Sequence, residues 1–188
     1  MKTAIIIVSL FAFACNNAGK DSVEKADSAN KSNLDTALSQ NSTVIDEASS
    51  EFIVRIANSG AAEEKLAAIA HEKAAYPDVK AYGGMLHHDH MALNDSIRLL
   101  ASIKKIVLPT TVTDDKQAAI TALQNKAGKE LDKEFINAMI EGHSRSIGAF
   151  ENAILDTKDQ DIRAFADRTL PKLKEHLAQA KALQKKYW

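Results

Sequence analysis

Residues 136–154 read INAMIEGHSRSIGAFENAI, and the apolar residues of this stretch recur every three or four positions. This spacing is typical of a helix that keeps one face against a core. His143 falls on that face, so its imidazole is expected to point inward with the apolar side chains. The full stripe consists of Ile136, Ile140, His143, Ile147, Phe150 and Ile154.

The same periodicity extends over most of the chain. It predicts four helices, and the third is expected to be interrupted near Gly128. No segment with strand periodicity competes with them, so the fold is predicted to be all-α. The expected helices cover residues 46–75, 78–105, 114–156 and 159–187.

An internal repeat relates the two halves of this region. A shift of 83 residues places 52–53 (Phe-Ile) on 135–136 and the segment 78–82 on 161–165. The repeat predicts two similar helical hairpins. Because short loops join antiparallel neighbours, we expect an antiparallel four-helix bundle over residues 47–187, with its helices running up-down-up-down.

Each predicted helix carries one potential metal ligand on its apolar stripe, namely Glu64, His90, His143 and His176. Glu64 and His90 lie equally far from the turn at Pro77, so they should sit level in an antiparallel pair. By the repeat, His143 and His176 should also sit level. One carboxylate and three imidazoles suit a single transition-metal ion such as iron, zinc, copper or manganese. The alternative is a hydrogen-bonded polar layer without metal.

Other polar residues lie near these positions in the sequence. His87 and His71 are candidate accessory ligands, whereas His88 is expected to face solvent. Asp89 directly precedes an inward histidine, and it is interpreted as an ordinary surface carboxylate. A supporting contact from Asp89 to a neighbouring histidine remains the alternative.

The N-terminus resembles a targeting segment. Residues 1–14 contain a lysine followed by a short apolar run, which is typical of a signal peptide. The run ends before Cys15, which is therefore predicted to be lipidated; a plain secretory signal is the alternative. Residues 15–46 are mostly polar and are predicted to form a flexible tether. The protein is thus expected to be attached to a membrane by lipid.

Composition narrows the functional classes. The formal net charge is −1 and no basic block is present, so nucleic acid is not an expected partner. A single cysteine permits no intramolecular disulfide. The chain has no nucleophile elbow and no phosphate-binding glycine loop, so no catalytic residue is assigned.

Several short motifs match a known family. They include 79–82 (Val-Lys-Ala-Tyr) with Asp89-His90, Leu108-Pro109, and 169–173 (Thr-Leu-Pro-Lys-Leu). Through them the chain resembles the ferritin-like domain-of-unknown-function family of bacterial envelope proteins, often labelled "predicted outer membrane protein". The resemblance implies a ferritin-like four-helix bundle in the bacterial cell envelope, anchored in the outer membrane and facing the periplasm. It implies no established activity.

The residues depart from the di-iron pattern of ferritin-like proteins, which combines glutamates with Glu-x-x-His motifs. The positions three before His90 and His176 hold His87 and Leu173. A single histidine-rich site is therefore expected instead of a carboxylate-bridged di-iron centre.

Three functional hypotheses follow. The leading one is a non-catalytic binding module with a metal site in the bundle core. The second is a metal-dependent redox or metal-handling enzyme. The third is a structural or stress-related envelope protein whose histidines bind no metal.

Overall fold

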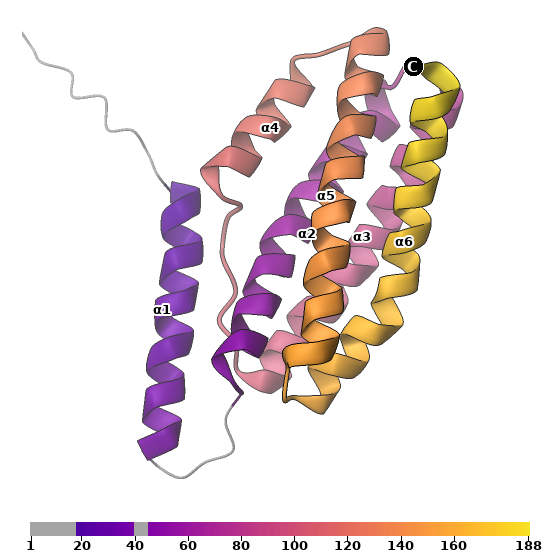
Figure 1. The fold of residues 1–188 in the computed structure, drawn as a ribbon. Coiled ribbons are helices and arrows are strands. Elements are labelled where there is room, and N and C mark those ends of the chain that lie inside the picture. The colour runs from indigo at the N-terminus through magenta and orange to yellow at the C-terminus, as the bar shows by residue number, and fades with distance from the viewer. Residues whose placement is uncertain (1–17, 40–44) are drawn as a thin grey trace, which may run out of the picture.

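The computed structural model describes residues 18–39 and 45–188, and all regular elements in these ranges are α-helices (Figure 1). The prediction of an all-α fold is confirmed for this part of the chain. None of the helices described is long and apolar enough to cross a membrane. The helices are α1 (Ala18–Ser39), α2 (Glu47–Lys73), α3 (Pro77–Lys104), α4 (Asp114–Gln124), α5 (Gly128–Asp156) and α6 (Gln160–Tyr187).

The four predicted helices appear close to their expected bounds, with the third divided into α4 and α5. Gly128 lies at this division and has a φ of 60°. Residues with a side chain rarely adopt this left-handed conformation, whereas glycine adopts it readily. The expected interruption near Gly128 is therefore confirmed.

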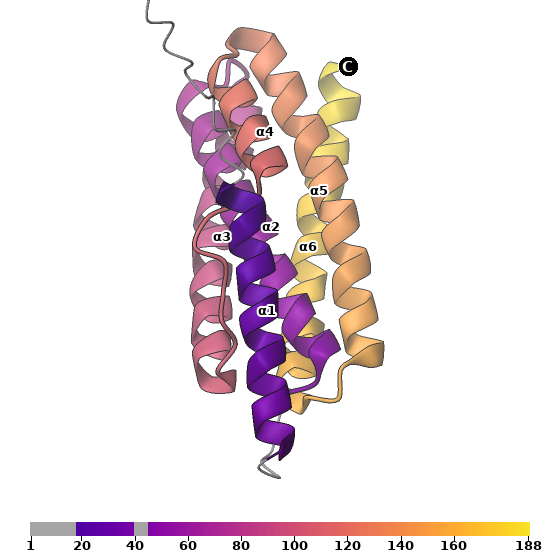
Figure 2. The ribbon, with the colours of Figure 1, turned by 90° about the vertical axis from the view of Figure 1, so that its left-hand side faces the viewer.

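The long helices form two antiparallel hairpins that pack on each other (Figures 1 and 2). One hairpin is α2 with α3 and the other is α5 with α6, and further contacts join α2 to α5 and α3 to α6. Figure 1 shows α2 and α6 running upward while α3 and α5 run downward. The predicted up-down-up-down course is wrong, because the link after α3 and helix α4 first return the chain to the end where α3 begins.

Among the described residues the core consists of two apolar clusters, and the stripe histidines fall between them along their helices. On α3, Leu86 belongs to one cluster and Ile97 to the other, with His90 between them. On α5, His143 lies in the same way between Met139 and Phe150. The positions of the histidines along their helices thus place a polar layer between the two apolar clusters of the core.

Helix α1 corrects the prediction that residues 15–46 form a flexible tether. The structure forms a helix over Ala18–Ser39 that packs against α2 and α4. The Asn30 side-chain amide donates to the Val107 carbonyl at 3.0 Å, and the Val107 N–H donates to Asn30 Oδ1 at 2.7 Å. Polar contacts of this kind help to hold α1 in place. A low apolar content is therefore not enough to predict a flexible segment here.

The predicted signal peptide, residues 1–14, and the predicted lipidation site Cys15 lie outside the described residues.

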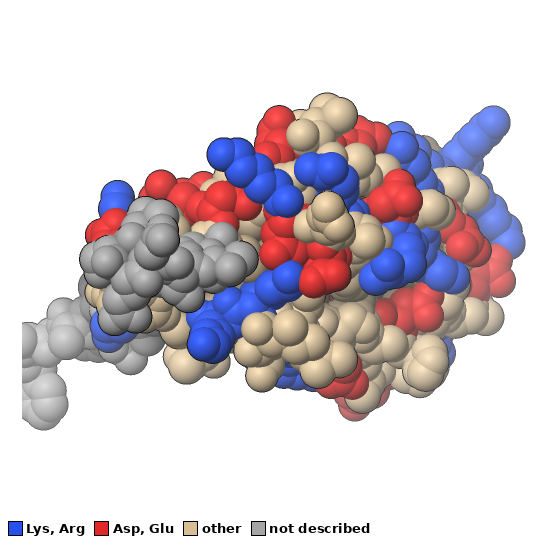
Figure 3. All heavy atoms as spheres, turned by 90° about the horizontal axis from the view of Figure 1, so that it is seen from below, with Lys and Arg blue, Asp and Glu red and all other residues tan. Residues whose placement is uncertain are grey.

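At the end of the molecule seen in Figure 3, acidic and basic side chains are interspersed over the surface. Lys104, the last residue of α3, pairs with Asp159 at 2.7 Å and with Asp161 at 2.6 Å.

Candidate metal centre

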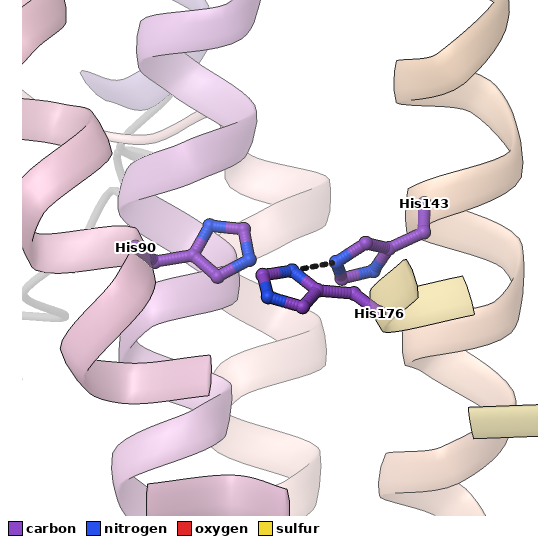
Figure 4. Close-up of side chains that lie close together, drawn as sticks. All are labelled: His90, His143 and His176. Carbon is purple, nitrogen blue, oxygen red and sulfur yellow. Dashed lines mark hydrogen bonds between the residues drawn. The ribbon is translucent and has the colours of Figure 1, made fainter. Parts of the chain in front are cut away.

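Three histidines from three helices meet in the interior. His90 on α3, His143 on α5 and His176 on α6 are each at most 2% exposed. One ring nitrogen from each can be chosen so that all three lie within 4.8 Å of one another. Figure 4 shows the rings pointing toward one another. Among the described residues, no other group of three or more histidine, cysteine or acidic side chains has such a geometry.

The tautomer of His143 is set by its own helix. Its Nδ1 lies 2.9 Å from the carbonyl oxygen of Met139, which can only accept a hydrogen bond. Nδ1 must therefore carry the proton, and in the neutral ring the lone pair is on Nε2. That Nε2 atom lies 3.3 Å from Nδ1 of His176, the contact marked in Figure 4.

The tautomer of His176 is set by a carboxylate. Its Nε2 lies 2.9 Å from Oδ2 of Asp89, so Nε2 donates and the lone pair of the neutral ring is on Nδ1. Neutral His143 and neutral His176 therefore present lone pairs to each other across 3.3 Å. Either a proton or a metal cation must lie between these atoms.

The separation fits a shared metal ion. Metal–nitrogen bonds of about 2.0–2.1 Å in tetrahedral geometry separate two ligand nitrogens by roughly 3.3–3.4 Å. The two facing nitrogens of His143 and His176 are 3.3 Å apart. Small side-chain rotations would be needed to bring His90 to the same distance.

His90 is the least satisfied member of the cluster. The side chain is 1% exposed, and neither ring nitrogen has a hydrogen-bond partner among the described residues. Burial, together with the neighbouring His143 and His176, lowers the pKa of His90 to about 3. Burial also lowers the pKa of His176. Both shifts favour neutral imidazole, which is the form that binds metal.

Glu63 is the acidic residue that α2 brings to the cluster. Its Oε2 lies 3.6 Å from Nε2 of His90, and burial raises the pKa of its carboxyl. A side chain at Gly142 of α5 would place its Cβ 2.6 Å from Oε1 of Glu63, so glycine makes room for the carboxyl. Glu63 is not part of the mutually close set formed by the three histidines.

The helical periodicity of the sequence pointed to Glu64 instead of Glu63. The structure leaves Glu64 partly exposed, and its Oε2 accepts a hydrogen bond from the Asn94 amide at 2.6 Å. The error is one residue, which turns a side chain by about 100° around a helix. The heptad formed by Ile56, Glu63 and Ala70, all buried, is the signal that would have found the inward carboxyl.

Of the remaining predictions near the cluster, some are confirmed and others are wrong. The accessory candidates His87 and His71 are not part of the close group, and His71 is exposed. His88 is exposed, as predicted. The interpretation of Asp89 as an ordinary surface carboxylate is wrong, because it holds the ring of His176. That contact joins α3 to α6, and a single sequence does not reveal which residues face each other between helices.

The fold and site define an all-helical domain with a buried histidine triad. The chain matches the family described as "Domain of unknown function (DUF4142)" over residues 23–183, and it belongs to this family. The matched region begins inside α1, so most of that helix is part of the family domain. No curated protein and no solved structure matches the chain significantly.

Proposed function

We propose that this protein binds a single transition-metal ion through His90, His143 and His176, as a binding module without turnover. The observation that carries the proposal is the 3.3 Å contact between two ring nitrogens, because each ring has its proton fixed on the other side. Asp89 supports the site by orienting His176, in the way that carboxylates orient many metal-bound histidines.

The donor set narrows the choice of metal. Imidazole nitrogens suit zinc, copper and iron, whereas manganese prefers oxygen ligands. No carboxylate lies in the mutually close set, which argues against a carboxylate-bridged di-iron centre. Zinc, copper and iron are therefore the expected ions.

A histidine layer without metal is the competing function. Asp89, His176, His143 and the Met139 carbonyl form a continuous chain of polar contacts. A protonated His176 could donate to Asp89 and to His143 at once and so satisfy this chain. Burial opposes that state, since it lowers the pKa of His176.

The test is metal analysis of the purified protein and of three variants. We expect about one ion per chain in the wild type and in His88→Ala, which changes an exposed histidine. His90→Ala and His143→Ala should lose the ion, with circular dichroism showing that each variant remains folded. Equal metal content in all four proteins would refute the site, and a metal-free wild type after metal loading would favour the histidine layer.

We also propose that the four long helices form a ferritin-like bundle. Ferritin-like bundles contain one long crossover connection between their two helical pairs. Here the link after α3 together with α4 makes such a crossover between the hairpins. Helix α1 would then be an addition on the outside of α2.

The envelope location is proposed on the sequence of the N-terminus. The apolar run before Cys15 suits a signal peptide and a lipidated cysteine. The protein would be tethered by lipid, on the periplasmic side of the outer membrane. Expression of wild type and Cys15→Ser in bacteria, followed by membrane fractionation, tests this: equal membrane partitioning would exclude the lipid anchor.

A further inference from the structure

A surface hollow of about 210 Å³ lies between α3 and α6 and reaches the triad. His90 and His176 line it, so two of the three proposed ligands border this space. His90 is the triad member without a hydrogen-bond partner among the described residues. The hollow is therefore a route by which a small solute could approach the metal.

The number of protein ligands leaves room for such a solute. Structural zinc sites use four protein ligands, whereas sites with three keep a position for water or an exogenous ligand. The triad supplies three nitrogens, and the Glu63 carboxyl is outside the mutually close set. Three neutral imidazoles do not neutralise the charge of a divalent ion, so a negatively charged fourth ligand would be favoured.

The charges around the hollow favour an anion. Arg168 and Lys172 on α6 line it together with Asp89. Lys172 lies 3.9 Å from Asp89 and 3.3 Å from Glu175, so acidic neighbours balance it. Arg168 has no acidic partner within salt-bridge distance among the described residues, and its guanidinium is free to attract an anion.

We infer that the metal's fourth position faces this hollow and takes a small monoanion from solvent, of the size of formate or bicarbonate. This inference rests on the proposed metal site. Arg168 would attract the anion electrostatically, while an oxygen of the anion would bind the metal. Leu93 and Leu173 line the hollow as well, and Thr169 adds one uncharged polar side chain to it.

The experiment uses the full protein loaded with Co²⁺, whose visible spectrum reports its ligands, and titrates it with azide or formate. We expect saturable spectral changes with both anions. Arg168→Glu should weaken azide binding by about fivefold, the size expected for an exposed charge, at unchanged cobalt stoichiometry. Lys181→Glu is the matched control, because it makes the same charge change at an exposed position of α6 outside the hollow.

The outcomes separate the two proposals. If cobalt binds through the triad but neither anion changes its spectrum, the open position is refuted and the metal site stands. If both charge variants bind azide as tightly as the wild type, the hollow is not the anion's route and the inference fails. If no cobalt binds, the metal site and the anion position fail together.

Discussion

The carboxylate of Asp89 on α3 accepts a hydrogen bond from Nε2 of His176 on α6 at 2.9 Å. The same imidazole presents Nδ1 to His143 on α5 at 3.3 Å. Asp89 is only partly buried, with its side chain 26% exposed, whereas both histidines are buried. A residue near the surface thus determines which nitrogen faces the centre of the triad.

Replacing Asp89 by alanine should weaken metal binding. Without the carboxylate the proton of His176 can move to Nδ1, and that tautomer cannot bind metal from this side. Loss of such a supporting contact typically lowers metal affinity by about 10- to 100-fold. Competition with a chromophoric chelator measures the change. Asp95→Ala is the control, because Asp95 is an exposed residue on the same helix that pairs with Arg98; equal affinities of the two variants would contradict the assigned role.

The metal-free protein should lose stability on acidification. The pKa of His90 is about 3 in the folded protein against 6.5 for a free histidine, so the unfolded chain binds more protons between these values. The free energy of unfolding should therefore fall as pH drops from 6.5 toward 3, by about 1.4 kcal/mol per pH unit for this one proton. Denaturant titrations across this range measure the slope, and His90→Leu should reduce it.

Glu63 has the opposite effect on how the free energy of unfolding depends on pH. Burial raises the pKa of its carboxyl, so above pH 4.5 the folded protein holds this proton more tightly than the unfolded chain does. Its contribution therefore increases stability as pH falls, and it partly offsets that of His90. Glu63→Gln should make the loss of stability between pH 6.5 and 4.5 steeper. A shallower loss would show that Glu63 is ionised in the folded protein.

The stripe on α5 was predictable because its period is strong and its residues differ sharply in polarity. Ile136, His143 and Phe150 are all fully buried or nearly so, as the heptad spacing indicated. On α2 the same reasoning failed, because alanines, glycine and adjacent glutamates give little contrast between faces. Either Glu63 or Glu64 fits an alanine-rich stripe, and packing against Gly142 decides between them.

Contacts between distant segments account for the other errors. The sequence of α1 is mostly polar and offers only small apolar contacts such as Ala26 and Val23. Side chains of the helix also pair with backbone groups 77 or more residues away. The direction of α5 depends on how far α4 carries the chain, which helical periodicity does not encode. Both features arise from tertiary packing, which overrides local composition.

Two glycines of α5 offer a matched test of the space around Glu63. Neither has positive φ, so alanine can adopt the backbone conformation at both. A Cβ at Gly148 would have no neighbour within 4 Å, and Gly148→Ala should stabilise the protein by about 0.5–1 kcal/mol through helix propensity. A Cβ at Gly142 would crowd the Glu63 carboxyl, which is buried and so cannot swing freely into solvent. Gly142→Ala should therefore destabilise the protein by about 1–3 kcal/mol.

A double-mutant cycle assigns the cause of that difference. In a Glu63→Ala background the crowded atom is absent, and Gly142→Ala should no longer be destabilising. Urea denaturation of the four proteins gives the coupling free energy, expected at about 0.5–3 kcal/mol for residues in contact. A coupling near zero would show that the carboxyl of Glu63 does not occupy the space beside Gly142.

Asn30 should determine whether α1 stays attached to the rest of the protein. Its side chain satisfies both the N–H and the carbonyl of Val107, in the link after α3. Asn30→Ala removes both hydrogen bonds and leaves the two Val107 groups without them, at a net loss of about 1–3 kcal/mol. Hydrogen exchange at the Val107 amide should accelerate strongly, whereas Asn33→Ala, at an exposed position of the same helix, should leave it unchanged. Equal exchange rates in both variants would mean that α1 is held by contacts other than this pair.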